Sequence, residues 1–180
     1  MNLPNKLTIA RIVMIPVFVV VLLLKYYYAA AGIFVLASVT DFLDGYIARK
    51  YNMISNFGKL MDPLADKLLV TSALVCLVEL GDIPSWMVII ILSREFTISI
   101  LRAVAAAEGK VIAASKWGKA KTVLQMIAVI SILIRNYPFE LLNIPFSDIA
   151  LWAAVILTII SGIDYIVKNR IFFMDKGDEQ

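Results

Sequence analysis

Residues 41–66 begin Asp41-Phe-Leu-Asp44-Gly45-Tyr-Ile-Ala48-Arg49 and, after eight further residues, end Gly58-Lys-Leu-Met-Asp62-Pro-Leu-Ala-Asp66. On an α-helix the numbered residues of the first half stand at positions i, i+3, i+4, i+7 and i+8 and therefore share one face. The numbered residues of the second half are four apart and share a face for the same reason. Two antiparallel helices joined by a short loop would bring these faces together, so the segment predicts a cage of four carboxylates with one arginine at its rim.

Most of the remaining sequence is apolar. The chain has 180 residues, of which 61% are hydrophobic and 17% are charged. A soluble domain of this length carries more charge, and the apolar residues come in blocks of roughly 20, which is the length of a helix that crosses a bilayer. We therefore predict an all-α, polytopic membrane protein built as a single domain, residues 1–180. The N-terminus lacks the charged start and cleavage site of a signal peptide, so the first apolar segment is expected to stay in the membrane.

Six membrane-spanning helices are expected after an N-terminal interfacial segment that contains Asn5, Thr8 and Arg11. Their approximate ranges are 7–26, 29–50, 57–80, 84–107, 118–136 and 147–168. Six spans place both termini on one side, and that side holds twelve basic residues, whereas the opposite loops hold only Lys25 and Arg135. The positive-inside rule predicts that both termini are cytoplasmic. The carboxylate cage is then cytoplasmic too, because its residues end the second span and begin the third.

The residue types present restrict the chemistry of this cage. The chain has no histidine and one cysteine, Cys76, within an apolar run, so an intrachain disulfide is impossible and the commonest transition-metal ligand is missing. Carboxylate oxygens favour hard cations such as Mg²⁺ or Mn²⁺. Each charge placed in a bilayer costs about 2.5–3.5 kcal/mol, and crowded carboxylates repel one another. Arg49 supplies one counter-charge, whereas two divalent cations would balance all four carboxylates.

Paired divalent cations at a membrane surface indicate phosphoryl chemistry, because they can clamp the attacking and leaving oxygens of a displacement at phosphorus. Gly45, Ala48 and Gly58 share the faces of the acids, so a bulky ligand could approach the backbone there. Small residues also let helices pack closely, and both roles are compatible with the sequence. The acids could instead form polar contacts between helices. That role explains a single acid more readily than four acids on facing surfaces.

A second cluster is basic and lies in the fourth predicted span and in the connection that opens the fifth. Arg94 and Arg102 are eight residues apart and share a helix face, and Glu95 is expected to pair with one of them. Three lysines follow in the sequence: Lys116, Lys119 and Lys121. Arginine forks bind phosphate oxygens, so the cluster predicts a pocket for a phosphorylated acceptor. The lysines could instead be attracted to anionic lipid headgroups.

The complete spacing D-x2-D-G-x2-A-R-x8-G-x3-D-x3-D, from Asp41 to Asp66, resembles the signature of the CDP-alcohol phosphatidyltransferase family. All eight defining positions are present. The stretch Leu-Pro-Asn5-Lys-Leu-Thr8-Ile-Ala-Arg11 is similar to the N-terminal segment of that family. The later stretches Ser93-Arg94-Glu95-Phe and Gly118-Lys119-Ala-Lys121-Thr122 resemble its bacterial phosphatidylglycerophosphate synthases in particular.

This resemblance implies an enzyme that transfers the phosphatidyl group of CDP-diacylglycerol to sn-glycerol 3-phosphate and releases CMP. It implies that Asp66 is the general base, and that four aspartates hold two divalent ions, Mg²⁺ or Mn²⁺: Asp41, Asp44, Asp62 and Asp66. The CDP-lipid site that it implies consists of Asn5, Thr8, Gly45, Ala48, Arg49 and Gly58. The acceptor phosphate would be bound by Arg94, Arg102, Lys116 and Lys119.

The family also implies a homodimer in the bacterial cytoplasmic membrane that acts in phospholipid biosynthesis, with membrane lipids and no nucleic acid as partners. One alternative keeps the family and changes the acceptor, as in cardiolipin or phosphatidylinositol phosphate synthases. The basic cluster disfavours serine as the acceptor, but charge alone does not separate glycerol phosphate from inositol phosphate. A second alternative is a cation transporter, although transporters place their sites near the midplane of the membrane. A transporter should bind neither CDP nor CMP.

Overall fold

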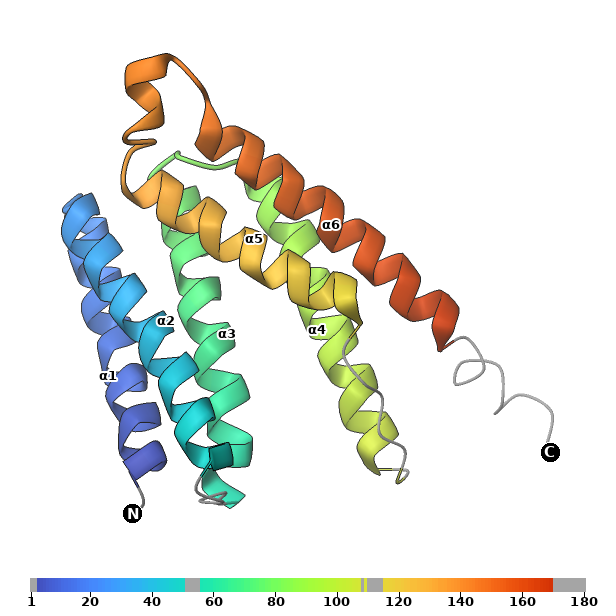
Figure 1. Ribbon diagram of the computed structural model, residues 1–180. Helices are drawn as coiled ribbons and strands as arrows, with labels where there is room; N and C mark the ends of the chain where they lie inside the picture. The colour runs from blue at the N-terminus through green and yellow to red at the C-terminus, as the bar shows by residue number, and fades with distance from the viewer. Residues whose placement is uncertain (1–2, 51–55, 108, 110–114, 170–180) are drawn as a thin grey trace. The chain divides into compact units, whose positions relative to one another are not determined.

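The computed structural model describes residues 3–50, 56–107, 109 and 115–169, with the side chains of 3–6, 42–50, 56–60, 62–63, 66 and 116 left out. Within these ranges the chain is all-helical and contains no strand (Figure 1). The α-helices are α1 (Leu3–Leu23), α2 (Tyr27–Lys50), α3 (Asn56–Glu79), α4 (Ser85–Ala107), α5 (Lys116–Leu133) and α6 (Phe146–Lys168), with a 3-10 helix, η1 (Phe139–Leu142). The α-helices have 18 to 24 residues, which is about 27–36 Å of helix at about 1.5 Å per residue.

Within the described ranges six α-helices occur in the predicted order, but α1 differs from its predicted span at both ends. It begins at Leu3 rather than near residue 7, so the N-terminal segment and the first span form one helix. It ends at Leu23 rather than near residue 26, because Lys25 has a φ of 65°. A left-handed backbone of this kind does not continue a right-handed helix.

Helix α5 also differs at both ends, and each difference has a local cause. It begins at Lys116 rather than at 118, because the Ser115 hydroxyl oxygen accepts a hydrogen bond from the Gly118 N–H at 3.0 Å. This is the hydrogen bond of a serine N-cap. The helix ends at Leu133 rather than at 136, because Arg135 and Asn136 have φ angles of 55° and 60°.

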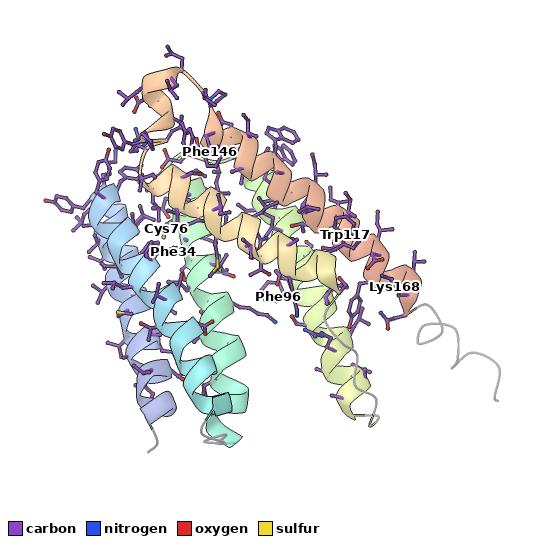
Figure 2. All side chains as sticks on the ribbon, in the orientation of Figure 1. Phe34, Cys76, Phe96, Trp117, Phe146 and Lys168 are labelled. Carbon is purple, nitrogen blue, oxygen red and sulfur yellow. The ribbon has the colours of Figure 1, made fainter. Side chains whose placement is uncertain are left out.

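The chain divides into two compact units, residues 1–84 with 129–147 and residues 85–128 with 148–180. In the first unit α1 packs against α2 and α3, which also contact each other. Phe18 and Phe34 are fully buried there, with ring centroids 5.8 Å apart, and Figure 2 shows Phe34 and the buried Cys76 in this unit. In the second unit Trp86 of α4 lies 5.5 Å from Trp152 of α6. The prediction that residues 1–180 act as one domain is not tested by this division and stays a prediction.

The distribution of polarity in α1 is the reverse of that in a soluble protein. Val13, Val17 and Val20 are 60%, 50% and 56% exposed, whereas Thr8 and Arg11 are fully buried. Large exposed apolar surfaces mark contact with a membrane or a partner, and charged groups in membrane helices face the protein interior. In the described part of the chain, α6 is long and apolar enough to cross a membrane, and Leu7–Leu23 and Tyr27–Asp41 are shorter apolar stretches. The other helices have their apolar runs interrupted by the charged residues of the two predicted clusters.

Candidate functional site

The two halves of the acidic motif lie on two helices of the first unit, as predicted. Asp41, Asp44, Gly45, Ala48 and Arg49 belong to the last part of α2. Gly58, Asp62 and Asp66 belong to the first half of α3. Because α2 and α3 are successive helices that contact each other, the backbone is compatible with the predicted approach of the two half-motifs. Of these residues only Asp41 has a described side chain, so the meeting of the four carboxylates stays a prediction.

Asp41 forms an ion pair that the sequence analysis did not predict. Its carboxylate oxygen Oδ1 accepts a charge-assisted hydrogen bond from the guanidinium of Arg11 on α1. The Arg11 side chain is fully buried, whereas that of Asp41 is 33% exposed. Arg11 therefore brings a positive charge to the first carboxylate of the motif, in addition to the charge expected from Arg49.

Arg11 belongs to a regular buried stripe on α1. The stripe consists of residues spaced by three or four: Thr8, Arg11, Ile15, Phe18 and Leu22. Positions with this spacing share one face of a helix. This spacing could have identified Arg11 from the sequence. Thr8 and Arg11 precede the apolar members of the stripe at the same intervals of three and four residues, so they lie on the same helix face. Asn5, one turn earlier, is in α1 with its side chain outside the described residues.

The donor set of this site fits a hard divalent cation. The motif offers carboxylate oxygens, and the chain has no histidine. Asp41 is partly exposed at the region where the two half-motifs are expected to meet, so its carboxylate is not sealed within the apolar core. Among the described side chains no group of three or more acids gathers, and Asp44, Asp62 and Asp66 are not among those side chains.

The basic cluster lies in the second unit, and two of its members share one acidic partner. Arg94 Nη1 donates to Glu95 Oε1 at 3.2 Å, and the ammonium of Lys121 on α5 forms an ion pair with the same oxygen. The prediction that Glu95 pairs with one of the arginines is therefore confirmed. Lys121 is 1% exposed, so it is not a lysine that reaches lipid headgroups.

Two other predicted members of the cluster, Arg102 and Lys119, are exposed, unlike Lys121. Arg102 is exposed on α4, and Tyr165 of α6 is buried. Lys119 is exposed on α5, and Lys116 is the first residue of that helix, with its side chain outside the described residues. The sequence analysis did not assign Tyr165 a role, because a lone tyrosine in an apolar span has no distinguishing pattern.

Arg94 lies between two glycines on neighbouring helices. A Cβ atom added to Gly162 of α6 would be 3.3 Å from Arg94 Cγ, and one added to Gly118 of α5 would be 3.4 Å from Arg94 Nη2. A residue larger than glycine at either position would therefore crowd the Arg94 side chain. In the described part of the chain, Arg94 Nε and the side-chain nitrogen of Gln125 are buried without a hydrogen-bond partner. Both are donors, so each is suited to an acceptor atom or an anion.

Comparisons with known proteins point to one family. The family model described as CDP-alcohol phosphatidyltransferase matches residues 1–160. A Bacillus subtilis protein named CDP-diacylglycerol–glycerol-3-phosphate 3-phosphatidyltransferase is 49% identical, over 93% of this chain and 95% of its own. A Rickettsia bellii protein of the same name is 42% identical over 96% of this chain and 97% of its own.

A Mycobacterium tuberculosis protein named probable phosphatidylglycerophosphate synthase is 39% identical over 93% of this chain and 81% of its own. The family model covers the acidic motif, the buried stripe of α1 and the basic cluster, all of which lie before residue 160. With relatives that align over nearly the whole chain, the protein belongs to the CDP-alcohol phosphatidyltransferase family.

Proposed function

We propose that this protein transfers the phosphatidyl group of CDP-diacylglycerol to sn-glycerol 3-phosphate in phospholipid biosynthesis. The products are phosphatidylglycerophosphate and CMP. The observation that carries this proposal is the complete acidic motif on α2 and α3, in a chain 49% identical to a protein named for this reaction. The transporter alternative is set aside, because the matched family and relatives are transferases.

In the proposed reaction the primary hydroxyl of glycerol 3-phosphate attacks the phosphorus that carries the diacylglycerol. A new oxygen–phosphorus bond forms as the bond to the CMP phosphate breaks, and CMP leaves with the electron pair. Asp66 takes the proton of the attacking hydroxyl. A carboxylate is a suitable base here because the chain has no histidine to do this work.

The family is generally dependent on divalent metal ions. We infer that two ions, Mg²⁺ or Mn²⁺, would be held by Asp41, Asp44, Asp62 and Asp66. When bound, they would stabilise the charge on the phosphate oxygens and on the leaving group. Arg11 holds the Asp41 carboxylate from the α1 side, which would orient one ligand before any ion binds.

For the donor, the CDP moiety is assigned to residues of α1, α2 and α3. They are Asn5, Thr8, Gly45, Ala48, Arg49 and Gly58. Thr8 supports this assignment, since it lies one turn from Arg11 on the buried face of α1 and Arg11 reaches Asp41. The small residues would leave space for the nucleotide beside the helix backbones.

For the acceptor, we assign the phosphate to four basic residues: Arg94, Arg102, Lys116 and Lys119. The position of the Arg94 guanidinium beside Gly118 supports this assignment, and Arg102 lies eight residues further along α4 on the same helix face. The matched relatives are bacterial and the family is membrane-associated. We further infer a homodimer in the cytoplasmic membrane, with both termini and the active site on the cytoplasmic side.

The test is CMP release by the purified protein in detergent with CDP-diacylglycerol and Mg²⁺. Five acceptors would be compared: glycerol 3-phosphate, inositol phosphate, free inositol, serine and phosphatidylglycerol. Release is expected only with glycerol 3-phosphate and should stop when EDTA is added. Release with another acceptor would contradict the assignment of the acceptor while keeping the reaction class. Absence of release with every acceptor, in protein that still unfolds cooperatively, would contradict the transferase proposal itself.

A further inference from the structure

We propose that Glu95 and Lys121 form a charge-balancing pair that positions Arg94 for the phosphate of the acceptor. Glu95 holds the Arg94 guanidinium, and Lys121 offsets the negative charge that Glu95 introduces. This inference rests on the proposed function, because it gives Arg94 the acceptor phosphate as its ligand. It assigns Lys121 a positioning role, distinct from direct binding of the acceptor.

The contacts define a chain of three charges in the second unit. Arg94 Nη1 lies 3.2 Å from Glu95 Oε1, and the Lys121 ammonium pairs with the same carboxylate. The exposures are 13% for the Arg94 side chain, 23% for Glu95 and 1% for Lys121. The lysine is therefore the most enclosed of the three, and the guanidinium and carboxylate retain some access to the surface.

The need for Lys121 follows from the charges. If Glu95 stood beside Arg94 alone, the two charges would cancel and the pair would offer an incoming phosphate little attraction. With Lys121 present, the group carries two positive charges and one negative charge, so it keeps a net positive charge. In surroundings of low polarity such differences in charge act strongly on a ligand.

The geometry around Arg94 is consistent with a fixed binding group. Gly118 and Gly162 flank the two ends of its side chain, at 3.4 Å and 3.3 Å for added Cβ atoms. Glu95 accepts a hydrogen bond from one terminal nitrogen, Nη1. A group already held in its binding geometry loses less freedom when the ligand arrives.

Two competing roles for the pair lead to different expected results. Lys121 could contact the acceptor itself, in which case removing it should weaken binding whatever residue occupies position 95. The pair could also serve only to join α4 and α5, in which case its loss should lower stability without a selective effect on one substrate. A double-mutant cycle separates these two roles from the positioning role.

The experiment compares Lys121→Met, Glu95→Gln and the double variant with the wild type. KM for glycerol 3-phosphate, KM for CDP-diacylglycerol and kcat would be measured for each. Lys121→Met should raise the acceptor KM by about tenfold, corresponding to about 1.4 kcal/mol, and leave the donor KM unchanged. Glu95→Gln alone should leave the acceptor KM nearly unchanged, because the added net positive charge offsets the weakened hydrogen bond to Arg94. The double variant should return to within about threefold of the wild type, because it restores the net charge of the group.

The matched control is Lys25→Met, at an exposed lysine of the first unit, which should leave both KM values unchanged. An acceptor KM that stays high in the double variant would show that Lys121 contacts the acceptor and overturn the proposal. An unchanged acceptor KM in Lys121→Met would also overturn it, as would an equal rise in both KM values. If Lys121→Met alone does not fold, Glu95→Gln is compared with the double variant instead. An acceptor KM of the double variant more than about threefold above that of the wild type would then overturn the proposal. A wild-type enzyme that does not use glycerol 3-phosphate would instead contradict the proposed function.

Discussion

At the scale of single residues, the pair of Arg11 and Asp41 joins α1 to the acidic motif. The two partners differ in surroundings, because the arginine side chain is fully buried and that of the aspartate is one-third exposed. Removing a partner from a buried charge costs more than removing one from a charge that water can reach. The pair should therefore respond asymmetrically to substitution.

We predict that Asp41→Asn lowers the free energy of unfolding more than Arg11→Met. The expected losses are about 1.5–3 kcal/mol for Asp41→Asn, the range for a hydrogen bond to a charged group, and about 0.5–1.5 kcal/mol for Arg11→Met. Thermal unfolding in detergent with EDTA would measure both, so that bound ions do not contribute. Asp148→Asn, at an exposed acid in the first turn of α6, is the control and should cost less than about 1 kcal/mol. Equal or reversed losses would contradict the asymmetry.

Asp66 is predicted to act on the hydroxyl of the acceptor, and Asp66→Asn removes its basicity with little change in size. We expect kcat to fall at least about 100-fold, as is typical when a general base is lost. The unfolding temperature should remain close to that of the wild type. CMP release and thermal unfolding of the same preparation would measure the two effects. Turnover like that of the wild type would exclude Asp66 as the base.

At the scale of helices, two features decide how neighbouring elements meet. In the second unit, glycines on α5 and α6 leave room for Arg94 of α4. In the first unit, Tyr27 at the start of α2 donates to Asp82 Oδ2 at 2.7 Å, and Arg135 lies 3.2 Å from Asp82 Oδ1. The Arg135 guanidinium also lies over the Tyr27 ring, 4.7 Å from its centroid. The Asp82 carboxylate, between α3 and α4, thus joins the start of α2 to the segment that follows α5.

Gly162→Ala should disturb Arg94 without disturbing the helix that carries the substitution. The new Cβ would lie 3.3 Å from Arg94 Cγ, which is tight enough to displace the side chain. We expect the acceptor KM to rise by about three- to tenfold with an unchanged donor KM. Gly32→Ala is the control, because an added Cβ there meets nothing within 4 Å. The same acceptor KM in both variants would show that Arg94 tolerates the contact.

The Asp82 cluster should lose more stability through its shared carboxylate than through either partner. Asp82→Ala removes both contacts and is expected to cost about 1–3 kcal/mol. Tyr27→Phe removes one hydrogen bond and should cost about 1 kcal/mol. Arg135→Met should cost less than about 1 kcal/mol, because the guanidinium is more than half exposed. Thermal unfolding would rank the three variants by their loss of stability. Glu140→Ala, at an exposed residue, is the control. A larger loss in Arg135→Met than in Asp82→Ala would contradict the shared role of the carboxylate.

At the scale of the whole molecule, the charge distribution predicts how the chain lies in the membrane. Among those of the twelve cytoplasmic basic residues whose side chains the structure describes, Arg11 and Lys121 are buried and do not contribute to a cytoplasmic surface. The remaining ten still exceed Lys25 and Arg135 on the other side. The predicted orientation is therefore unchanged by the structure.

Cysteine labelling in intact and permeabilised spheroplasts tests this orientation. Glu140→Cys should react with a membrane-impermeant maleimide in intact spheroplasts, because residue 140 follows the fifth span. Gly177→Cys, in the C-terminal tail, should react only after permeabilisation. The wild-type protein is the control, since Cys76 is its one cysteine and is buried. The opposite labelling pattern would reverse the predicted topology.

The sequence alone determined the helices, their order and the family. Blocks of about 20 apolar residues predict helices because a bilayer leaves no water to satisfy the backbone. The acidic motif could be recognised because its spacing is local to two helices. The C-terminal ends of α1 and α5 were predicted less well. Lys25, Arg135 and Asn136 adopt left-handed backbone conformations there, which their neighbours in sequence do not specify.

Only the tertiary structure decided which distant charges meet. Arg11 pairs with Asp41 across 30 residues, and Lys121 meets Glu95 from the next helix. Arg135 joins Asp82 across 53 residues. These pairings depend on how helices pack and on which faces they bury, whereas helical periodicity specifies only which residues share a face. The physical reason is that contacts between helices determine which side chains meet in the interior. The spacing of residues along the chain does not specify those contacts.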